Sequence, residues 1–173
     1  HLEQALESAI DHGAKAITLM SQLIVEGDPD FAERIRQRIT EAGLLLCGPN
    51  GMGFYNPRDG VWVCGFDTRA NHAPGGNVTL ISQSGAGMSG IVDCEERIDF
   101  NLAVSTGSEF TVGVADYMDF AIEEHQPRAI GLFLETARDP QGLVDVLVKA
   151  LQRDIPVVAV KVGRTALSAR LAQ

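Results

Sequence analysis

The chain has 173 residues, of which 45% are hydrophobic and 21% are charged, and this is the composition of an ordinary globular protein with one domain or two small ones. Its net charge of -9 argues against nucleic-acid binding, which depends on clustered Lys and Arg. No apolar run in the sequence approaches the ~20 residues that span a bilayer, so we expect no membrane association through a spanning helix.

The three cysteines, Cys47, Cys64 and Cys94, lie far apart and match neither a zinc-binding pattern nor a disulfide framework. We therefore expect reduced thiols, a cytoplasmic protein and no metal site. The chain begins at His1, and the residues that follow already have helical spacing. We expect a fragment that starts inside a fold.

Helices and strands are predicted to alternate from the first residues onward. The first four predicted elements are a helix over 2–12, a strand over 16–20, a helix over 29–42 and a strand over 44–47. Asp28 before Pro29 is the pairing expected of an N-cap and a first helical residue. The last of these strands ends at the turn Gly48-Pro49-Asn50-Gly51.

A change of composition marks a predicted domain boundary. Residues 55–76 contain two prolines, several glycines and many polar residues around Trp62, and such stretches connect domains. The predicted organisation is a first domain over 1–57, a linker over 58–76 with a short extended segment, and a second domain over 77–173.

The alternation resumes after this boundary. The predicted elements are strands over 78–81, 102–105, 129–134 and 156–161, with helices over about 86–97, 112–124 and 140–152 between them. Apolar strands that alternate with helices of this length predict an α/β fold of βαβ units with a parallel sheet. In such sheets ligands bind at the carboxyl ends of the strands.

Short polar segments follow the predicted strands, and the one after residue 81 is the most informative. The apolar run stops at Ser82, and a helix then begins near Ser84-Gly85-Ala86. The free backbone N–H groups and the dipole of a helix start attract phosphate or another anion. The alternative is simple capping, since polar loops follow strands in many proteins.

Two titratable residues have positions that suggest a role. Glu135 directly follows the strand over 129–134, where a carboxylate can orient an imidazole or accept a proton. The alternatives are an N-cap or an ion pair with Arg138 or Arg164. His125 follows two glutamates at a predicted helix end, and we expect an exposed, partly cationic ring that caps this helix.

Two known motifs do not match the chain. The nucleophile elbow of serine hydrolases needs glycine two positions before the serine, where Ser82 stands before Ser84. The segment Gly85-Ala86-Gly87 lacks the third glycine of the dinucleotide-binding fingerprint.

Four longer segments carry a family resemblance. They are GPNGMGFYNP at 48–57, NVTLISQSGAGM at 77–88, LFLETARDP at 132–140 and PVVAVKVGRT at 156–165. In this order and at these intervals they resemble segments of the NDP-forming acyl-CoA synthetases, which are similar to the alpha subunit of succinyl-CoA synthetase. The resemblance implies the end of a Rossmann-like CoA-binding domain followed by a flavodoxin-like domain.

The resemblance also implies a ligase reaction. Enzymes of this family interconvert a carboxylic acid, CoA and ATP with acyl-CoA, ADP and phosphate, through an acyl phosphate and a phosphohistidine. By resemblance, Ser84, Gly85 and Ala86 would bind the phosphoryl group, and Glu135 would hydrogen-bond the histidine that carries it.

The remaining functions are implied to lie partly outside this chain. CoA would contact Ser21, Gln22 and Asn50, while ATP or ADP with magnesium would bind mainly to an ATP-grasp domain or subunit, and the enzyme could be an oligomer. In the family the phosphorylated histidine lies just beyond the segment like 156–165, so we expect these 173 residues to be inactive alone. The alternatives are a non-catalytic domain that senses CoA or acyl-CoA, as beside some protein acetyltransferases, and a plain flavodoxin-like binding domain.

Overall fold

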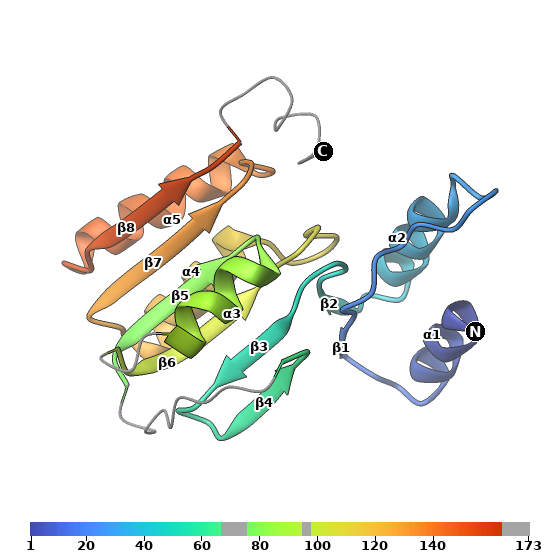
Figure 1. The fold of residues 1–173 in the computed structure, drawn as a ribbon, viewed down its shortest axis with the longest axis horizontal. Helices are drawn as coiled ribbons and strands as arrows, with labels where there is room; N and C mark the ends of the chain where they lie inside the picture. Colours follow the sequence, from blue (N-terminus) through green and yellow to red (C-terminus); the bar gives the residue numbers. More distant parts are fainter. Residues whose placement is uncertain (67–75, 95–97, 164–173) are drawn as a thin grey trace.

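The computed structural model describes residues 1–66, 76–94 and 98–163, and Figure 1 shows its fold. Some sequence predictions concern other parts of the chain: Arg164 and the side chain of Cys94 lie outside the described residues. The same holds for the end of the helix predicted over 86–97 and for the last residues of the predicted second domain.

The first two strands form a small parallel sheet beside two helices. The elements are α1 (Leu2–Asp11), β1 (Ala16–Thr18), α2 (Phe31–Glu41) and β2 (Leu45–Cys47). Helical spacing gathers apolar side chains on one face of each helix, and they pack with the sheet in a core of Leu6, Leu23, Ile35, Ile39, Leu44 and Leu46. The predicted alternation of helices and strands is confirmed here.

The start of α2 differs from the prediction. Asp30 precedes the helix, so the prediction that Asp28 and Pro29 begin it is wrong. The Asp28 carboxylate instead accepts two hydrogen bonds from the Arg34 guanidinium, at 2.8 and 2.7 Å. This paired geometry ties Asp28 to a residue of the first turn of α2 from outside the helix.

The other strands form one six-stranded sheet in the order β4-β3-β6-β5-β7-β8. They are β3 (Gly53–Asn56), β4 (Val61–Cys64), β5 (Val78–Ser82), β6 (Phe100–Ser105), β7 (Ala129–Leu134) and β8 (Val157–Lys161). β5 pairs in parallel with β6 and β7, and β7 pairs in parallel with β8, as helical crossovers between strands allow. The predicted α/β fold with parallel βαβ units is confirmed.

Helices cover both faces of this sheet (Figure 1). α3 (Gly85–Cys94) lies on one face, and α4 (Val114–Phe120), the π-helical turn η1 (Ala121–His125) and α5 (Pro140–Gln152) lie on the other. Because successive side chains of a strand point to opposite faces, Leu80 packs with Met88 of α3, whereas Ile81 packs with Met118 of α4.

A hairpin extends the sheet by antiparallel pairing, which the sequence analysis does not predict. β3 pairs with β6, and β4 forms the edge of the sheet, where the ring of Trp62 lies 5.8 Å from that of Tyr55. The segment expected to be extended within a linker is therefore an edge strand. The two sheets divide between β2 and β3, while the domain limits at residues 57 and 77 stay predictions.

The turn over 48–51 lies between the two sheets and is tied to the loop that follows β6. The Ser108 N–H donates to the Pro49 carbonyl oxygen at 2.7 Å, and the Leu46 N–H donates to Thr111 Oγ1 at 2.8 Å. These bonds hold the end of the small sheet beside the carboxyl end of β6.

His125 is buried, so the prediction of an exposed cap is wrong. Its side chain is 1% exposed, and its Nε2 lies 3.6 Å from Oδ2 of Asp59. The π-helical turn places the ring beside Phe120, with 5.2 Å between ring centroids. Burial lowers the pKa of His125, and the charge of Arg58 adds to this, while Asp59 acts in the opposite direction. The ring is therefore neutral near pH 7.

We expect Gly107→Ala to destabilise the fold. Gly107 has φ +61°, and a Cβ there would lie 2.1 Å from the Pro49 carbonyl oxygen. The left-handed conformation alone costs a non-glycine residue about 1–2 kcal/mol, and the clash adds to it. Gly60→Ala is the control, because Gly60 has φ +67° but open space around it. Denaturant unfolding should show the larger loss for Gly107→Ala, and equal losses would contradict this close approach.

We also expect His125 to make stability depend on pH. Its folded-state pKa is below its ordinary value, so the unfolded chain binds the proton more readily. The free energy of unfolding then falls as the pH drops below about 6.5, by at most about 1.4 kcal/mol per pH unit for one proton. Unfolding measured between pH 7 and 5 should show a flatter dependence for His125→Phe. Gln141→Leu, on the exposed face of α5, is the control and should keep the wild-type slope.

Candidate functional site

A hollow at the carboxyl ends of the strands gathers most of the predicted site residues. It has a volume of about 310 Å³ and is lined by Met20, Asn50, Gly51, Met52, Gln83, Ser84, Gly85, Ala86 and Glu135. The turn over 48–51, the start of α3 and the residue after β7 thus meet at one place. The proximity of these residues is observed, and the roles assigned to them stay predictions.

The start of α3 is organised by two serines. The Ser82 hydroxyl donates to the Ser84 carbonyl oxygen at 2.7 Å and accepts from the Ser84 N–H at 3.2 Å. The Ser84 hydroxyl accepts from the Gly87 N–H at 3.1 Å, as an N-cap does. Within the described residues nothing accepts from the N–H groups of Gly85 and Ala86, so they are available to an anion.

Gly85 has no room for a side chain. A Cβ at this position would lie 2.4 Å from Cγ of Met52. Met52, the residue just before β3, therefore lies close to the start of α3. A glycine at position 85 leaves the backbone N–H groups accessible from the hollow.

Glu135 is held through its backbone. Its N–H donates to Gln83 Oε1 at 2.7 Å, and its carbonyl oxygen accepts from Lys161 Nζ at 2.8 Å. No described residue donates to its carboxylate or forms an ion pair with it. The half-buried carboxylate is therefore available to a group that enters the hollow.

The structure contradicts an N-cap role for Glu135 and gives it no ion pair with Arg138. The N-cap of α5 is Asp139, whose Oδ1 accepts from the Gly142 N–H at 2.9 Å. Arg138 turns toward another acid, with its Nε 3.9 Å from Oε2 of Glu109. Its other candidate partner, Arg164, lies outside the described residues.

The three residues predicted to contact CoA are only partly brought together. The Asn50 N–H donates to the Ser21 carbonyl oxygen at 3.1 Å, and Asn50 lines the hollow. Ser21 and Gln22 are exposed and do not line it. The structure thus joins Asn50 to the site and leaves the other two beside it.

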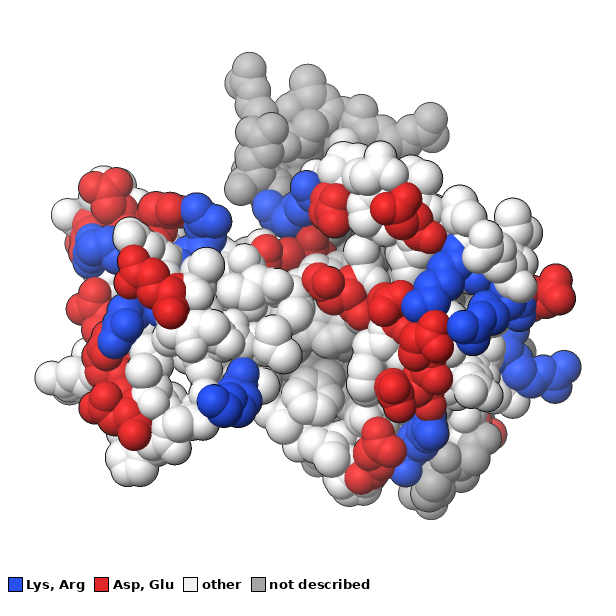
Figure 2. Space-filling view, turned by 180° about the vertical axis from the view of Figure 1, so that it is seen from behind, with Lys and Arg blue, Asp and Glu red and all other residues white. Residues whose placement is uncertain are grey.

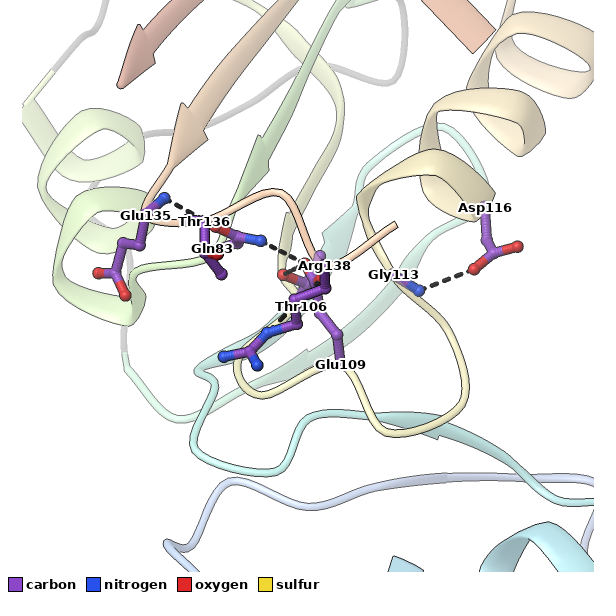
Figure 3. A network of polar contacts seen from close by, with 8 residues as sticks. All are labelled: Gln83, Thr106, Glu109, Gly113, Asp116, Glu135, Thr136 and Arg138. Carbon is purple, nitrogen blue, oxygen red and sulfur yellow. Dashed lines mark hydrogen bonds and ion pairs between the residues drawn. The ribbon is translucent and has the colours of Figure 1, made fainter. Parts of the chain in front are cut away.

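Gln83 and Glu109, for which the sequence predicts no role, lie in a polar network (Figure 3). Gln83 Oε1 accepts from the N–H groups of Glu135 and Thr136, and its Nε2 donates to Glu109 Oε1 at 3.0 Å. Thr106 donates to the same carboxylate oxygen at 2.7 Å. The sequence signal that could have identified them is their position, because both lie in the polar segments that follow β5 and β6.

On the face shown in Figure 2, the charged side chains of the described residues do not form a purely basic patch. Figure 2 shows acidic and basic side chains interspersed on the face seen from behind. Lys149 and Arg153, for example, lie 2.7 and 3.1 Å from Glu123, and these contacts lower the pKa of the Glu123 carboxyl. An anion in the hollow would depend on local donors, which are the backbone N–H groups at the start of α3.

Two features are absent from the part of the chain that the structure describes. No helix there is both long and apolar enough to pass through a membrane. No three or more His, Cys, Asp or Glu side chains gather there in a way that could hold a metal ion.

Comparisons with known proteins agree with the fold. A family model described as the succinyl-CoA ligase like flavodoxin domain matches residues 75–173. The alpha subunit of ADP-forming acetate–CoA ligase II from Pyrococcus furiosus is 27% identical over 99% of this chain and 37% of its own length. An ADP-forming acetate–CoA ligase from Methanocaldococcus jannaschii is 25% identical over 98% of this chain and 24% of its own length.

A solved structure is similar over nearly the whole chain. It is the dinucleotide forming acetyl-coenzyme A synthetase 1 of Candidatus Korarchaeum cryptofilum in complex with phosphate and ADP, with a TM-score of 0.81 and 25% identity. The match covers 99% of this chain and 37% of that one. The chain therefore spans between about a quarter and little more than a third of the length of these proteins.

We expect Ser84→Ala to lower stability through loss of the N-cap. Removing a serine cap costs about 1 kcal/mol, here because the Gly87 N–H loses its acceptor. Ser89→Ala on the same helix is the control, since Ser89 only donates to the Ala86 carbonyl oxygen at 3.3 Å and alanine favours the helix. Thermal or denaturant unfolding measures both, and equal stability of Ser84→Ala and the wild type would contradict the cap.

Proposed function

The chain belongs to the family of the succinyl-CoA ligase like flavodoxin domain, and from this we propose that it is the phosphoryl-binding part of an NDP-forming acyl-CoA synthetase. The whole enzyme would interconvert a carboxylic acid, CoA and ATP with acyl-CoA, ADP and phosphate. The observation that supports this most is that Ser84, Gly85, Ala86 and Glu135 line one hollow.

The start of α3 would bind the phosphoryl group. Its oxygens would accept hydrogen bonds from the N–H groups of Gly85 and Ala86, where the helix dipole also favours negative charge. The Ser84 hydroxyl, which accepts from Gly87, still has a proton to donate to a phosphoryl oxygen. This binding needs no basic surface, in agreement with the net charge of -9.

Glu135 would orient the histidine that carries the phosphoryl group. A carboxylate that accepts from one ring N–H leaves the lone pair of the other nitrogen free to attack phosphorus. In this step a nitrogen–phosphorus bond forms while the bond between phosphorus and its leaving oxygen breaks. Among the described residues His125 cannot serve, because it is buried before the amino end of β7. The histidine would come from outside the described residues.

CoA would bind beside the hollow, and the nucleotide would bind mainly outside this chain. The exposed Ser21 and Gln22 lie beside Asn50, and their polar side chains fit contacts to CoA. By the same family resemblance, ATP or ADP with its magnesium would be held mainly by an ATP-grasp domain or subunit. The relative from P. furiosus is itself named as a subunit, which supports assembly with a partner.

We expect the complete enzyme to form an acid-labile phosphoprotein when it is incubated with labelled ATP. Glu135→Gln combined with Ser84→Asp should abolish labelling, because the first change weakens the bond to the imidazole and the second puts a negative charge beside the phosphate. The control combines Glu124→Gln with Ser89→Asp, which makes the same changes away from the hollow.

Unchanged labelling of the first double variant would contradict these roles. Absence of labelling in the wild type, together with CoA binding in calorimetric titration, would indicate a CoA-sensing domain and contradict the ligase proposal.

A further inference from the structure

We propose that Gln83 is a positioning residue for Glu135, and that the buried carboxylate of Glu109 sets the orientation of the Gln83 carboxamide. This inference rests on the proposed function, and it explains how the phosphate-binding turn and Glu135 keep a fixed geometry. Figure 3 shows Gln83 between the end of β7 and Glu109.

Gln83 holds the end of β7 at three points. Its own N–H donates to the Phe133 carbonyl oxygen at 2.9 Å. Its side-chain Oε1 accepts from the Glu135 N–H at 2.7 Å and from the Thr136 N–H at 2.9 Å. One carbonyl oxygen thus uses both lone pairs on consecutive backbone donors, and this fixes where the Glu135 side chain begins.

Glu109 determines which way the carboxamide faces. Its side chain is 6% exposed, and its Oε1 accepts from Gln83 Nε2 at 3.0 Å and from Thr106 Oγ1 at 2.7 Å. An ionised carboxylate is only an acceptor, so it requires the NH₂ group of Gln83 on its side. A flipped carboxamide would place oxygen against the carboxylate and NH₂ against two backbone N–H groups, which leaves buried polar groups unpaired.

The backbone of Glu109 supports this reading. Its φ is +55°, a conformation that a residue with a side chain adopts at an energetic cost. In this conformation the carboxylate contacts both Thr106 and Gln83, and its other oxygen lies 3.9 Å from Arg138.

Because Gln83 directly precedes Ser84, a single residue links the two halves of the proposed site. Its backbone continues into the proposed phosphate-binding turn, while its side chain accepts hydrogen bonds from the backbone of Glu135 and Thr136. A displacement of about 1 Å between reacting groups can lower a rate by about 100-fold, so loss of this link should reduce catalysis without removing any group that touches phosphate.

The first experiment removes the link. In the complete enzyme assayed in the ATP-forming direction, Gln83→Leu should lower kcat by about 10- to 100-fold and leave KM for phosphate unchanged. Hydrogen–deuterium exchange of the same protein should become faster in the peptide that contains Glu135 and Thr136. Gln141→Leu is the control, since Gln141 donates to Asp145 at 2.8 Å on the exposed face of α5, and it should change neither result.

The second experiment exchanges the amide and the carboxylate between positions 83 and 109. Gln83→Glu should lower kcat and speed exchange, because it sets two carboxylates face to face in a buried site. Adding Glu109→Gln should restore both, since a glutamine NH₂ in the place of Oε1 can donate to a carboxylate at 83 and to the Thr106 hydroxyl, which can accept as well as donate. Gln141→Glu, beside the exposed Asp145, is the control for the added charge and should have little effect.

The proposal would be overturned if Gln83→Leu kept the kcat and the hydrogen–deuterium exchange rate of the wild type. It would also be overturned if the double variant Gln83→Glu with Glu109→Gln had a kcat and an exchange rate no closer to the wild type than those of Gln83→Glu. If Gln83→Leu does not fold, the comparison of Gln83→Glu with the double variant decides by itself. If the wild type forms no phosphoprotein, the proposed function fails, while the exchange measurements still decide whether Gln83 and Glu109 hold the backbone of Glu135.

Discussion

Parallel pairing of the central strands is the constraint on which the rest of the structure depends. β5 lies between β6 and β7, with Ser82 opposite both Ser105 and Phe133. Parallel strands end at the same edge of their sheet, so the segments that follow them leave side by side. Ser84 and Glu135 are therefore neighbours because of backbone hydrogen bonds, and side chains only refine their arrangement.

The antiparallel hairpin brings a third segment to this edge. β3 runs opposite to β6, so its amino end lies at the carboxyl end of β6, with Gly53 opposite Ser105. The turn over 48–51 comes just before β3 and is carried to the hollow with it. The same pairing joins the small first sheet to the larger one, and Asn50 thereby becomes part of the candidate site.

The site is organised by hydrogen bonds among partly or fully buried groups rather than by exposed ion pairs. Exposed pairs such as Arg153 with Glu123 contribute little to stability. In contrast, a buried polar group must find its partner, because leaving it unpaired is costly. This requirement gives the network of Gln83 and Glu109 one orientation, and it gives the loop of Glu135 a defined position in a protein whose surface carries an excess of negative charge.

Outside the hairpin of β3 and β4, the sequence by itself determined the kinds of elements, their order and the edge of the sheet where polar residues gather, because apolar periodicity is a local property. The strand Ala129–Leu134 and the helix Pro140–Gln152 have the predicted limits. Only the tertiary structure decided that the hairpin joins the sheet, that His125 is buried beside Asp59, and that Gln83 holds the backbone after β7. These features depend on contacts between residues far apart in the chain, and no local pattern records which distant partner a strand or a side chain will meet.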